Sequence, residues 1–175
     1  MAEWYVVQAA AGAEQDVRMR LNRLAYPAML PMKVMRERRT GACRDVTRVM
    51  LPGYVFVESE MAAADWHRIR NLPGVLRILG GEHPAPLSEE EAARIAWLDN
   101  GGEAWAISTA KATPKGVIIT GGPLALFEKE IESIDRRQSR ARIHASVLGE
   151  TKRIDLALVF EESATDNRQP EEPEG

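Results

Sequence analysis

Side chains of the types that do catalytic or metal chemistry are few in this 175-residue chain and lie far apart in the sequence. The chain has a single cysteine, Cys43, which cannot form an internal disulfide. Its three histidines have no metal-ligand spacing: His67, His83 and His144. Without a histidine, cysteine or paired-carboxylate constellation, or a glycine-rich phosphate loop, no nucleophile has a base beside it. The sequence therefore predicts a protein that is not an enzyme and that holds no metal or cofactor.

Basic residues are grouped in a way that suits binding to phosphates. Between Lys33 and Arg48 the chain has six of them against two acidic residues: Lys33, Arg36, Arg38, Arg39, Arg44 and Arg48. A second cluster has four arginines within seven positions, followed by two more basic residues: Arg136, Arg137, Arg140, Arg142, Lys152 and Arg153. Such side chains neutralise a nucleic-acid backbone whatever its base sequence. For a single member, an ordinary solvated charge is the alternative.

The formal net charge of -3 does not oppose this interpretation. Residues 1–112 carry 14 basic and 14 acidic residues, and residues 113–162 carry 8 of each. The whole deficit lies in residues 163–175, with one basic and four acidic residues. That segment has no aliphatic or aromatic residue beyond one alanine, so we predict a disordered acidic tail.

An aromatic strand follows a Pro-Gly turn in the stretch MLPGYVFVE at residues 50–58. The period of two places Tyr54 and Phe56 on one face of that strand. Rings on a preformed surface suit a protein interface, because they bring much apolar area for little lost entropy. The alternative is that Phe56, and Tyr54 with it, fill the core of the protein.

The elements around these residues predict an α+β first domain over residues 1–100. A strand at 3–9 precedes a helix from Ala13 whose apolar residues Val17, Leu21 and Leu24 fall at helical spacing. A long hairpin turns at Thr40-Gly41, and a strand and a short helix follow it. A capping box formed by Ser88 and Glu91 begins a further helix, which ends at paired glycines.

The second half of the chain predicts a small all-β barrel over residues 114–162, after a linker at 101–113. Its apolar runs GVIIT, KEIESI, RARIHASV and TKRIDLALVF alternate and are separated by turn residues. In the third run, we expect Ala141, Ile143, Ala145 and Val147 to face inward. One conflict is visible: Leu124, Phe127, Ile131 and Ile134 also share a helical stripe, so helix and strand compete there.

Four collinear motifs carry a family resemblance. WYVVQAAAGAEQDVRMRL, LPGYVFVESEM, WHRIRNLPGVLRILGG and PLSEEE resemble the N-terminal (NGN) domain of the NusG family of transcription elongation factors, and GVIITGGPLALFEKEIESID resembles the family's SH3-like KOW barrel. The match covers about residues 1–161. It implies an NGN-type domain with a mostly antiparallel sheet flanked by helices, joined to a KOW domain.

The resemblance also implies a partner, RNA polymerase, whose clamp helices the family's first domain binds. The matching positions are Leu51, Pro52, Tyr54 and Phe56, and we expect that surface to be open to solvent. Basic residues of the hairpin and of the following helix match parts of the family that lie beside upstream and non-template DNA: Arg36, Arg38, Arg39, His67, Arg68 and Arg70.

Within the family, the second domain departs from the general pattern. Leu124, Leu126 and Lys129 stand where the pattern has an aromatic residue and glycines. The run is more similar to LoaP, a specialised paralogue that promotes antitermination of particular operons and binds an RNA hairpin. That resemblance implies RNA contacts by the second arginine cluster with Lys152 and Arg153, recognised chiefly by shape. Another relative, RfaH, refolds this domain, so a fold switch is a further alternative.

Three functions remain open from the sequence. The first is an antitermination factor for specific operons, and the second is a general NusG-like elongation and termination factor with ribosomal-protein or termination-factor contacts. The third is a KOW-containing RNA-binding or ribosome-associated protein, although such a protein has no need of the LPGYVFV surface and is usually more basic. We expect a monomer in the cytoplasm, since no apolar run is long enough to span a membrane and the N-terminus lacks the pattern of a secretory signal.

Overall fold

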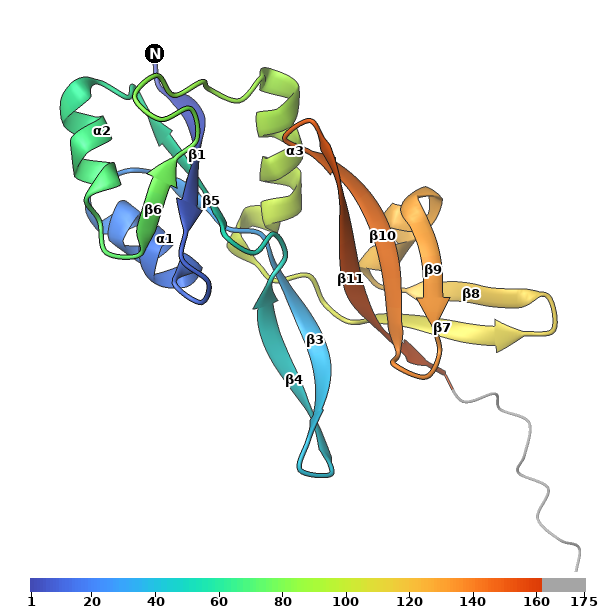
Figure 1. Ribbon diagram of the computed structural model, residues 1–175. Helices are drawn as coiled ribbons and strands as arrows, with labels where there is room; N and C mark the ends of the chain where they lie inside the picture. The colour runs from blue at the N-terminus through green and yellow to red at the C-terminus, as the bar shows by residue number, and fades with distance from the viewer. Residues whose placement is uncertain (162–175) are drawn as a thin grey trace, which may run out of the picture.

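The computed structural model describes residues 1–161 and has an α+β architecture of two sheets and a separate hairpin (Figure 1). The first sheet is antiparallel, with the strand order β2-β5-β1-β6. Its strands are β1 (Glu3–Ala9), β2 (Ala28–Met29), β5 (Tyr54–Ser59) and β6 (Val75–Ile78). Three α-helices accompany it: α1 (Glu14–Arg23), α2 (Ala63–Arg70) and α3 (Glu89–Asp99).

Both faces of the first sheet are buried. Alternate side chains of β1 and β5 point to opposite faces and pack in two different clusters. Val7 and Val55 belong to a buried cluster with residues of α1 and α2. Val6 and Phe56, one position along each strand, belong to a second cluster with α3. Successive side chains of a strand point to opposite faces, so the apolar runs predicted for an inner sheet are buried on both sides.

Helix α3 lies between the two sheets (Figure 1). The predicted capping box forms at its start, where the Glu91 amide donates to Ser88 Oγ at 3.1 Å and the Ser88 amide donates to the Glu91 carboxylate at 3.2 Å. Its end is a left-handed Asn100, with φ of 53°, followed by the paired glycines. At the end of α1, by contrast, Leu24 is the C-cap and its side chain is exposed. The prediction that Leu24 lies on the apolar face of this helix is therefore wrong.

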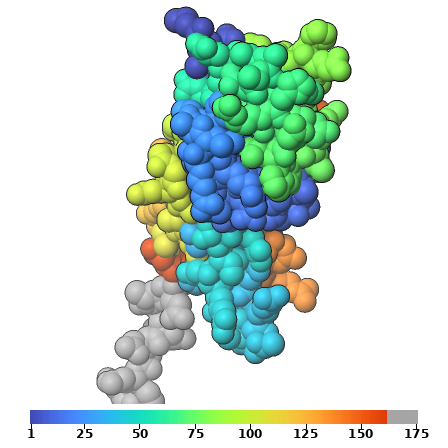
Figure 2. All heavy atoms as spheres, turned by 90° about the vertical axis from the view of Figure 1, so that its left-hand side faces the viewer, coloured from blue at the N-terminus to red at the C-terminus, as the bar shows by residue number. Residues whose placement is uncertain are grey.

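The hairpin of β3 (Met32–Arg39) and β4 (Ala42–Val49) projects from the first sheet (Figure 2). Thr40 and Gly41 form its two-residue turn as predicted, and both have positive φ, of 49° and 79°. A positive φ at both central positions matches the twist of the flanking strands. At the base, β3 meets residues beyond α3, since Val34 donates a backbone hydrogen bond to the Trp105 carbonyl at 2.8 Å.

The second sheet is curled, as in a small barrel, with the order β8-β7-β11-β10-β9. Its strands are β7 (Ser108–Thr113), β8 (Gly116–Gly121), β9 (Ile131–Asp135), β10 (Arg140–Val147) and β11 (Glu150–Phe160). All neighbours are antiparallel except β11 and β7, which are parallel. The predicted inward residues of β10 are buried: Ala141, Ile143, Ala145 and Val147.

Two features of this sheet correct the sequence-based expectations. The linker was predicted at 101–113, but Ser108–Thr113 forms β7, because Ser108 and Ala110 are fully buried and Ser108 Oγ accepts a hydrogen bond from the Leu124 amide at 2.9 Å. The run with competing helix and strand signals divides into a 3-10 helix, η2 (Pro123–Glu130), and strand β9. Leu124 and Phe127 of η2 are buried in the cluster shared with α3.

No helix in residues 1–161 is both long and apolar enough to cross a membrane. The predicted disordered tail at 163–175 lies outside the described residues.

Candidate binding surfaces

The turn before β5 is held in place by backbone contacts to β1 and by one buried carboxylate. The Gly53 amide donates to Glu14 Oε1 at 3.0 Å, and the Gly53 carbonyl accepts from the Ala9 amide at 2.9 Å. Gly53 has a φ of 86°, a conformation that a side chain would strain. Glu14 begins α1 and is buried, and a carboxylate there also suits the positive end of the helix dipole. The position of the aromatic strand is thus fixed, as the sequence indicates.

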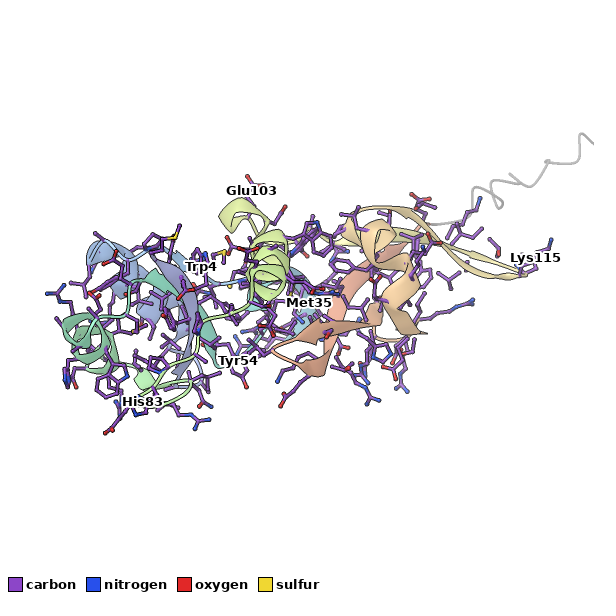
Figure 3. All side chains as sticks on the ribbon, turned by 90° about the horizontal axis from the view of Figure 1, so that it is seen from above. Trp4, Met35, Tyr54, His83, Glu103 and Lys115 are labelled. Atoms are coloured by element: carbon purple, nitrogen blue, oxygen red, sulfur yellow. The ribbon has the colours of Figure 1, made fainter. Side chains whose placement is uncertain are left out.

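The aromatic surface itself is not open to solvent in this structure, which corrects our expectation. Phe56 has an exposed fraction of 0% and Leu51 one of 4%, while Tyr54 is half-buried and Pro52 is exposed. Leu51 and Phe56 belong to one buried cluster with residues of α3 and of the second sheet. Figure 3 shows Tyr54 and Met35 in the region where the two sheets meet.

One lysine of the second sheet lies directly against the candidate surface. Lys152 Nζ is 5.1 Å from the centre of the Tyr54 ring, within reach of a cation–π interaction. Its hydrogen bond with Glu150 and the nearby Tyr54 raise the pKa of Lys152, so the ammonium is charged at neutral pH. Lys152, predicted to contact RNA, is therefore engaged with a residue predicted to contact polymerase.

Three aromatic rings join α3 to the second sheet. The ring centres of Trp97, Trp105 and Phe127 are 5.0 to 5.5 Å apart, in tilted and edge-to-face pairs. Trp105 Nε1 donates to the Leu98 carbonyl at 2.7 Å, which satisfies its buried polar group. Trp105 lies in the segment predicted to be a linker; the tryptophans on either side of the paired glycines, Trp97 and Trp105, were the available signal in the sequence.

The residues predicted to lie along DNA come from two separate places. Arg36, Arg38 and Arg39 are on the hairpin, and Arg36 forms an ion pair with Asp45 at 3.0 Å. His67, Arg68 and Arg70 are exposed on α2, at the other end of the first sheet (Figure 1). The described structure does not bring the two groups together.

Half of the residues predicted to contact RNA are engaged within the second sheet. Arg142 pairs with Asp155 at 2.8 Å, Arg153 with Glu132 at 3.3 Å and Lys152 with Glu150 at 3.1 Å. The other half are in or beside the turn between β9 and β10. Among the ion pairs within residues 1–161, none includes these three: Arg136, Arg137 and Arg140.

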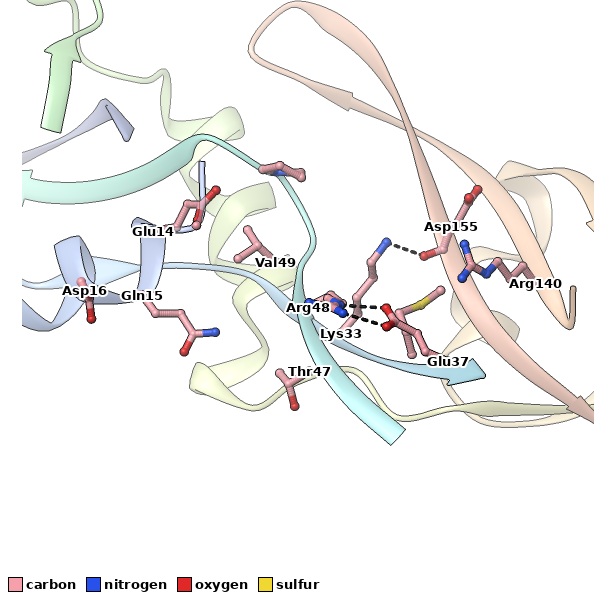
Figure 4. A pocket seen from close by; sticks show the side chains of 13 residues that line it. Glu14, Gln15, Asp16, Lys33, Glu37, Thr47, Arg48, Val49, Arg140 and Asp155 are labelled. Carbon is pink, nitrogen blue, oxygen red and sulfur yellow. Dashed lines mark hydrogen bonds and ion pairs between the residues drawn. The ribbon is translucent and has the colours of Figure 1, made fainter. Parts of the chain in front are cut away.

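A polar cavity of about 640 Å³ lies where the hairpin, α1 and the second sheet meet (Figure 4). Lys33 of β3 spans this junction, and its Nζ donates to the Asp155 carbonyl at 2.6 Å. Burial lowers the pKa of Lys33, with the nearby Arg140 acting in the same direction and Asp155 opposing it. On the hairpin side, Arg48 donates two hydrogen bonds to the Glu37 carboxylate at 2.8 and 2.7 Å.

Potential metal ligands are dispersed through the described residues, and the fold is similar to that of a solved structure. Within residues 1–161, no group of three or more His, Cys, Asp or Glu residues is placed to hold a metal ion. A solved structure described as "Domain interaction in Thermotoga maritima NusG" matches 90% of this chain and 94% of its own, with a TM-score of 0.52 and 18% identity. At that identity the likeness shows the fold alone: this chain shares the overall fold of that structure.

Sequence comparisons then give the family. A family model described as "Transcription termination factor nusG" matches residues 2–96. The "Transcription termination/antitermination protein NusG" of Vibrio cholerae is 32% identical over 165 residues, covering 87% of this chain and 91% of the relative. The protein of the same description from Escherichia coli K12 has the same identity and coverage. The chain belongs to the NusG family.

Proposed function

We propose that this protein is a non-enzymatic transcription elongation factor that binds RNA polymerase and promotes antitermination of specific operons. The observation that carries the proposal is its similarity to NusG proteins over 87% of the chain, which includes the LPGYVFV stretch. The relatives' printed description, termination and antitermination, supports action on transcription.

Polymerase binds at Leu51, Pro52, Tyr54 and Phe56 in this proposal. Pro52 and the half-buried Tyr54 are accessible in this arrangement, whereas Leu51 and Phe56 are buried in the cluster that includes residues of α3 and of the second sheet. A partner helix that contacts all four residues therefore requires part of this cluster, in α3 or in the second sheet, to move away. Two polar contacts across the junction would have to break in such a movement. One is the single hydrogen bond from Lys33 Nζ to the Asp155 carbonyl, and the other is the cation–π contact of Lys152 with the Tyr54 ring.

The nucleic-acid contacts follow the two basic clusters. The hairpin arginines and the exposed basic residues of α2 would lie along upstream and non-template DNA, while the second cluster with Lys152 and Arg153 would contact an RNA hairpin in the nascent transcript. Support comes from the exposure of most of these side chains. Backbone contacts of this kind give affinity without base reading.

A general elongation and termination factor is the second candidate function. Its support is the relatives themselves, whose description names both termination and antitermination. The support for the specialised function is the changed pattern in η2, where Leu124 is fully buried and donates its amide to Ser108 Oγ. A ribosomal protein or a termination factor would be a further partner of the general form.

Transcription in vitro past a terminator, with and without a candidate leader RNA in the template, tests the specialised function. Read-through that depends on the leader supports it, whereas read-through or termination that is independent of every leader tried favours the general factor.

A pull-down with RNA polymerase tests the docking surface separately. Tyr54→Ala removes the ring and should weaken binding, while Tyr54→Phe keeps the ring and should bind as the wild type does. Circular dichroism of both variants checks that the fold is retained. Equal binding of polymerase by the alanine variant would contradict the docking assignment.

A further inference from the structure

Two basic clusters that are about 100 residues apart in the sequence line one cleft in the structure. Its volume is about 570 Å³, and its walls are the β3–β4 hairpin and the turn between β9 and β10. Arginines from both walls face it: Arg36 and Arg38 from the hairpin, and Arg137 and Arg140 from the turn. Figure 2 shows atoms of the orange segment, which holds this turn, beside the cyan hairpin.

The charge of this cleft is strongly unbalanced. The eight lining residues include four arginines and one carboxylate, Glu37. That carboxylate is already engaged by Arg48, whose hydrogen bonds lower the pKa of Glu37 and keep it ionised. Within residues 1–161, three of the four arginines take part in no ion pair: Arg38, Arg137 and Arg140. Three arginines that form no ion pair within the described residues thus line one cleft, where an anion can reach them from two walls.

The remaining lining residues indicate which anion fits. They are small or polar: Cys43 on the hairpin, and Gln138 and Ser139 in the turn. Within residues 1–161, none of the residues that line the cleft is aromatic, so these residues offer bases no ring on which to stack. The chemistry offered is guanidinium to phosphate, with hydroxyl and amide donors beside it. Contacts of this kind fix the path of a nucleic-acid backbone without reading its sequence.

We propose that the hairpin and the β9–β10 turn form one composite site that binds the phosphate backbone of a single nucleic-acid strand. This deepens the proposed function, which assigns the same arginines to two separate nucleic acids. Because the walls come from different sheets, the site exists only in the closed arrangement, in which the second sheet packs beside the first and Lys152 lies against the Tyr54 ring. A strand bound there therefore stabilises the closed arrangement and opposes the docking of polymerase.

The test uses the isolated chain, and fluorescent 12-nucleotide oligouridylate and oligothymidylate serve as RNA and DNA probes. Affinity is measured by anisotropy over a series of salt concentrations for wild type, Arg38→Gln and Arg137→Gln. Each variant loses one phosphate contact, so the slope of log K against log salt should decrease by about 0.7 in both. The matched control is Arg20→Gln with Arg94→Gln, two exposed arginines outside the cleft, which should leave the slope unchanged.

Cys43 supplies a second readout, because it lines the cleft and is the only cysteine of the chain. With oligonucleotide at about 100 times its Kd, roughly 1% of the protein is free, so alkylation of Cys43 by N-ethylmaleimide should slow by at least tenfold. In the Arg38→Gln/Arg137→Gln double variant, at the same oligonucleotide concentration, this protection should be largely lost relative to that variant's own rate without oligonucleotide.

The outcomes separate the composite site from its alternatives. A slope that changes with Arg137→Gln but not with Arg38→Gln would place the strand on the second sheet alone and overturn the proposal. Undiminished alkylation of Cys43 at saturation would overturn it as well. Stronger protection by one of the two probes would identify the strand as RNA or as DNA. None of these results depends on polymerase, so failure of the docking assignment leaves the test intact.

Discussion

The two faces of the first sheet both bury apolar side chains but are covered by different kinds of neighbour. On one face, Val7 and Val55 pack against α1 and α2, which follow their strands within a few residues along the chain. On the other, Val6 and Phe56 pack with α3 and, through it, with a second sheet that begins only at Ser108. The elements that pack on the first face are close in sequence to its strands, whereas the second sheet lies about 50 residues beyond β5.

This difference separates a permanent core from a surface that is able to change partners. The buried residues of the cluster on the α1 and α2 side all lie within the first 78 residues, whereas the cluster on the other side also includes residues of the second sheet, so a movement of that sheet would disturb only the second cluster. An aromatic surface that must serve a partner is therefore expected on the face covered by the distant element. Phe56 and Tyr54 lie on that face.

The largest expected effect tests whether the distantly covered face is a full part of the core. Phe56→Ala removes a ring with an exposed fraction of 0%, and such truncations cost about 3–5 kcal/mol of the free energy of unfolding. Urea denaturation followed by circular dichroism measures the loss. The half-buried Tyr54→Ala is the control and should cost less; a cost below about 1 kcal/mol for Phe56→Ala would mean that the face is only loosely covered.

The next variant weakens the second sheet and leaves α1 and α2, which pack on the other face of the first sheet, unchanged. Gly122 has a φ of 86°, and an added Cβ would lie 2.6 Å from Ser108 Cα. Gly122→Ala should therefore destabilise the second sheet by about 2–3 kcal/mol, through backbone strain and overpacking. Hydrogen exchange should then rise in the second sheet, while the amides of α1 stay protected.

Gly149→Ala is the matched control for that variant. Gly149 also has a positive φ, of 73°, but no atom lies within 4 Å of an added Cβ. Only the conformational cost, about 1–2 kcal/mol, applies there. Equal destabilisation by both variants would show that the close approach of Gly122 to Ser108 does not matter.

A smaller effect concerns α3, the helix that contacts both sheets. Ser88→Ala removes the side-chain acceptor for the Glu91 amide and should cost about 1 kcal/mol of the free energy of unfolding. Thermal denaturation measures the loss, and Ser88→Asp, which restores an acceptor, should recover most of it. No loss in the alanine variant would indicate that packing between the sheets alone holds the helix start.

The smallest effect is the pH dependence of the second sheet. The hydrogen bond from Arg142 holds the pKa of Asp155 below its ordinary value of 3.8. The carboxylate's contribution to stability is therefore complete above pH 3.8 and is lost as the pH falls through the lower, folded-state pKa. Urea denaturation at several pH values should show a shallower acid loss in Asp155→Asn; identical profiles would contradict the assignment.

The sequence predicted local elements well because their signals are local. The Thr40-Gly41 turn, the Ser88 capping box and the inward residues of β10 are each determined by neighbours along the chain, and the structure confirms them. Strand β7 was missed because Ser108–Thr113 has almost no apolar pattern and becomes a strand through its pairing with β8 and β11. The cover over Phe56 was missed for a similar reason, since a single sequence does not specify which distant surface packs on an apolar face.

The assignments of binding residues stay predictions. The structure shows that some of these residues form ion pairs within the protein and that others do not. Arg142, Lys152 and Arg153 are engaged by carboxylates of their own sheet, whereas Arg137 and Arg140 form no ion pair with any residue of 1–161. Charge counting alone did not distinguish these residues, because ion pairs between strands depend on register. The pairing of Arg142 with Asp155 across β10 and β11 is one such case.

The apolar cluster that runs from Val6 through Ile95 to Ile143 has a consequence for how this chain has evolved. Two halves that share one packed interior do not vary independently, since a larger side chain on one must be met by a smaller one on the other. A chimera that joins residues 1–106 to the corresponding barrel of a relative would mismatch this contact. Such a hybrid should melt earlier than either parent, even though each half is drawn from a natural protein.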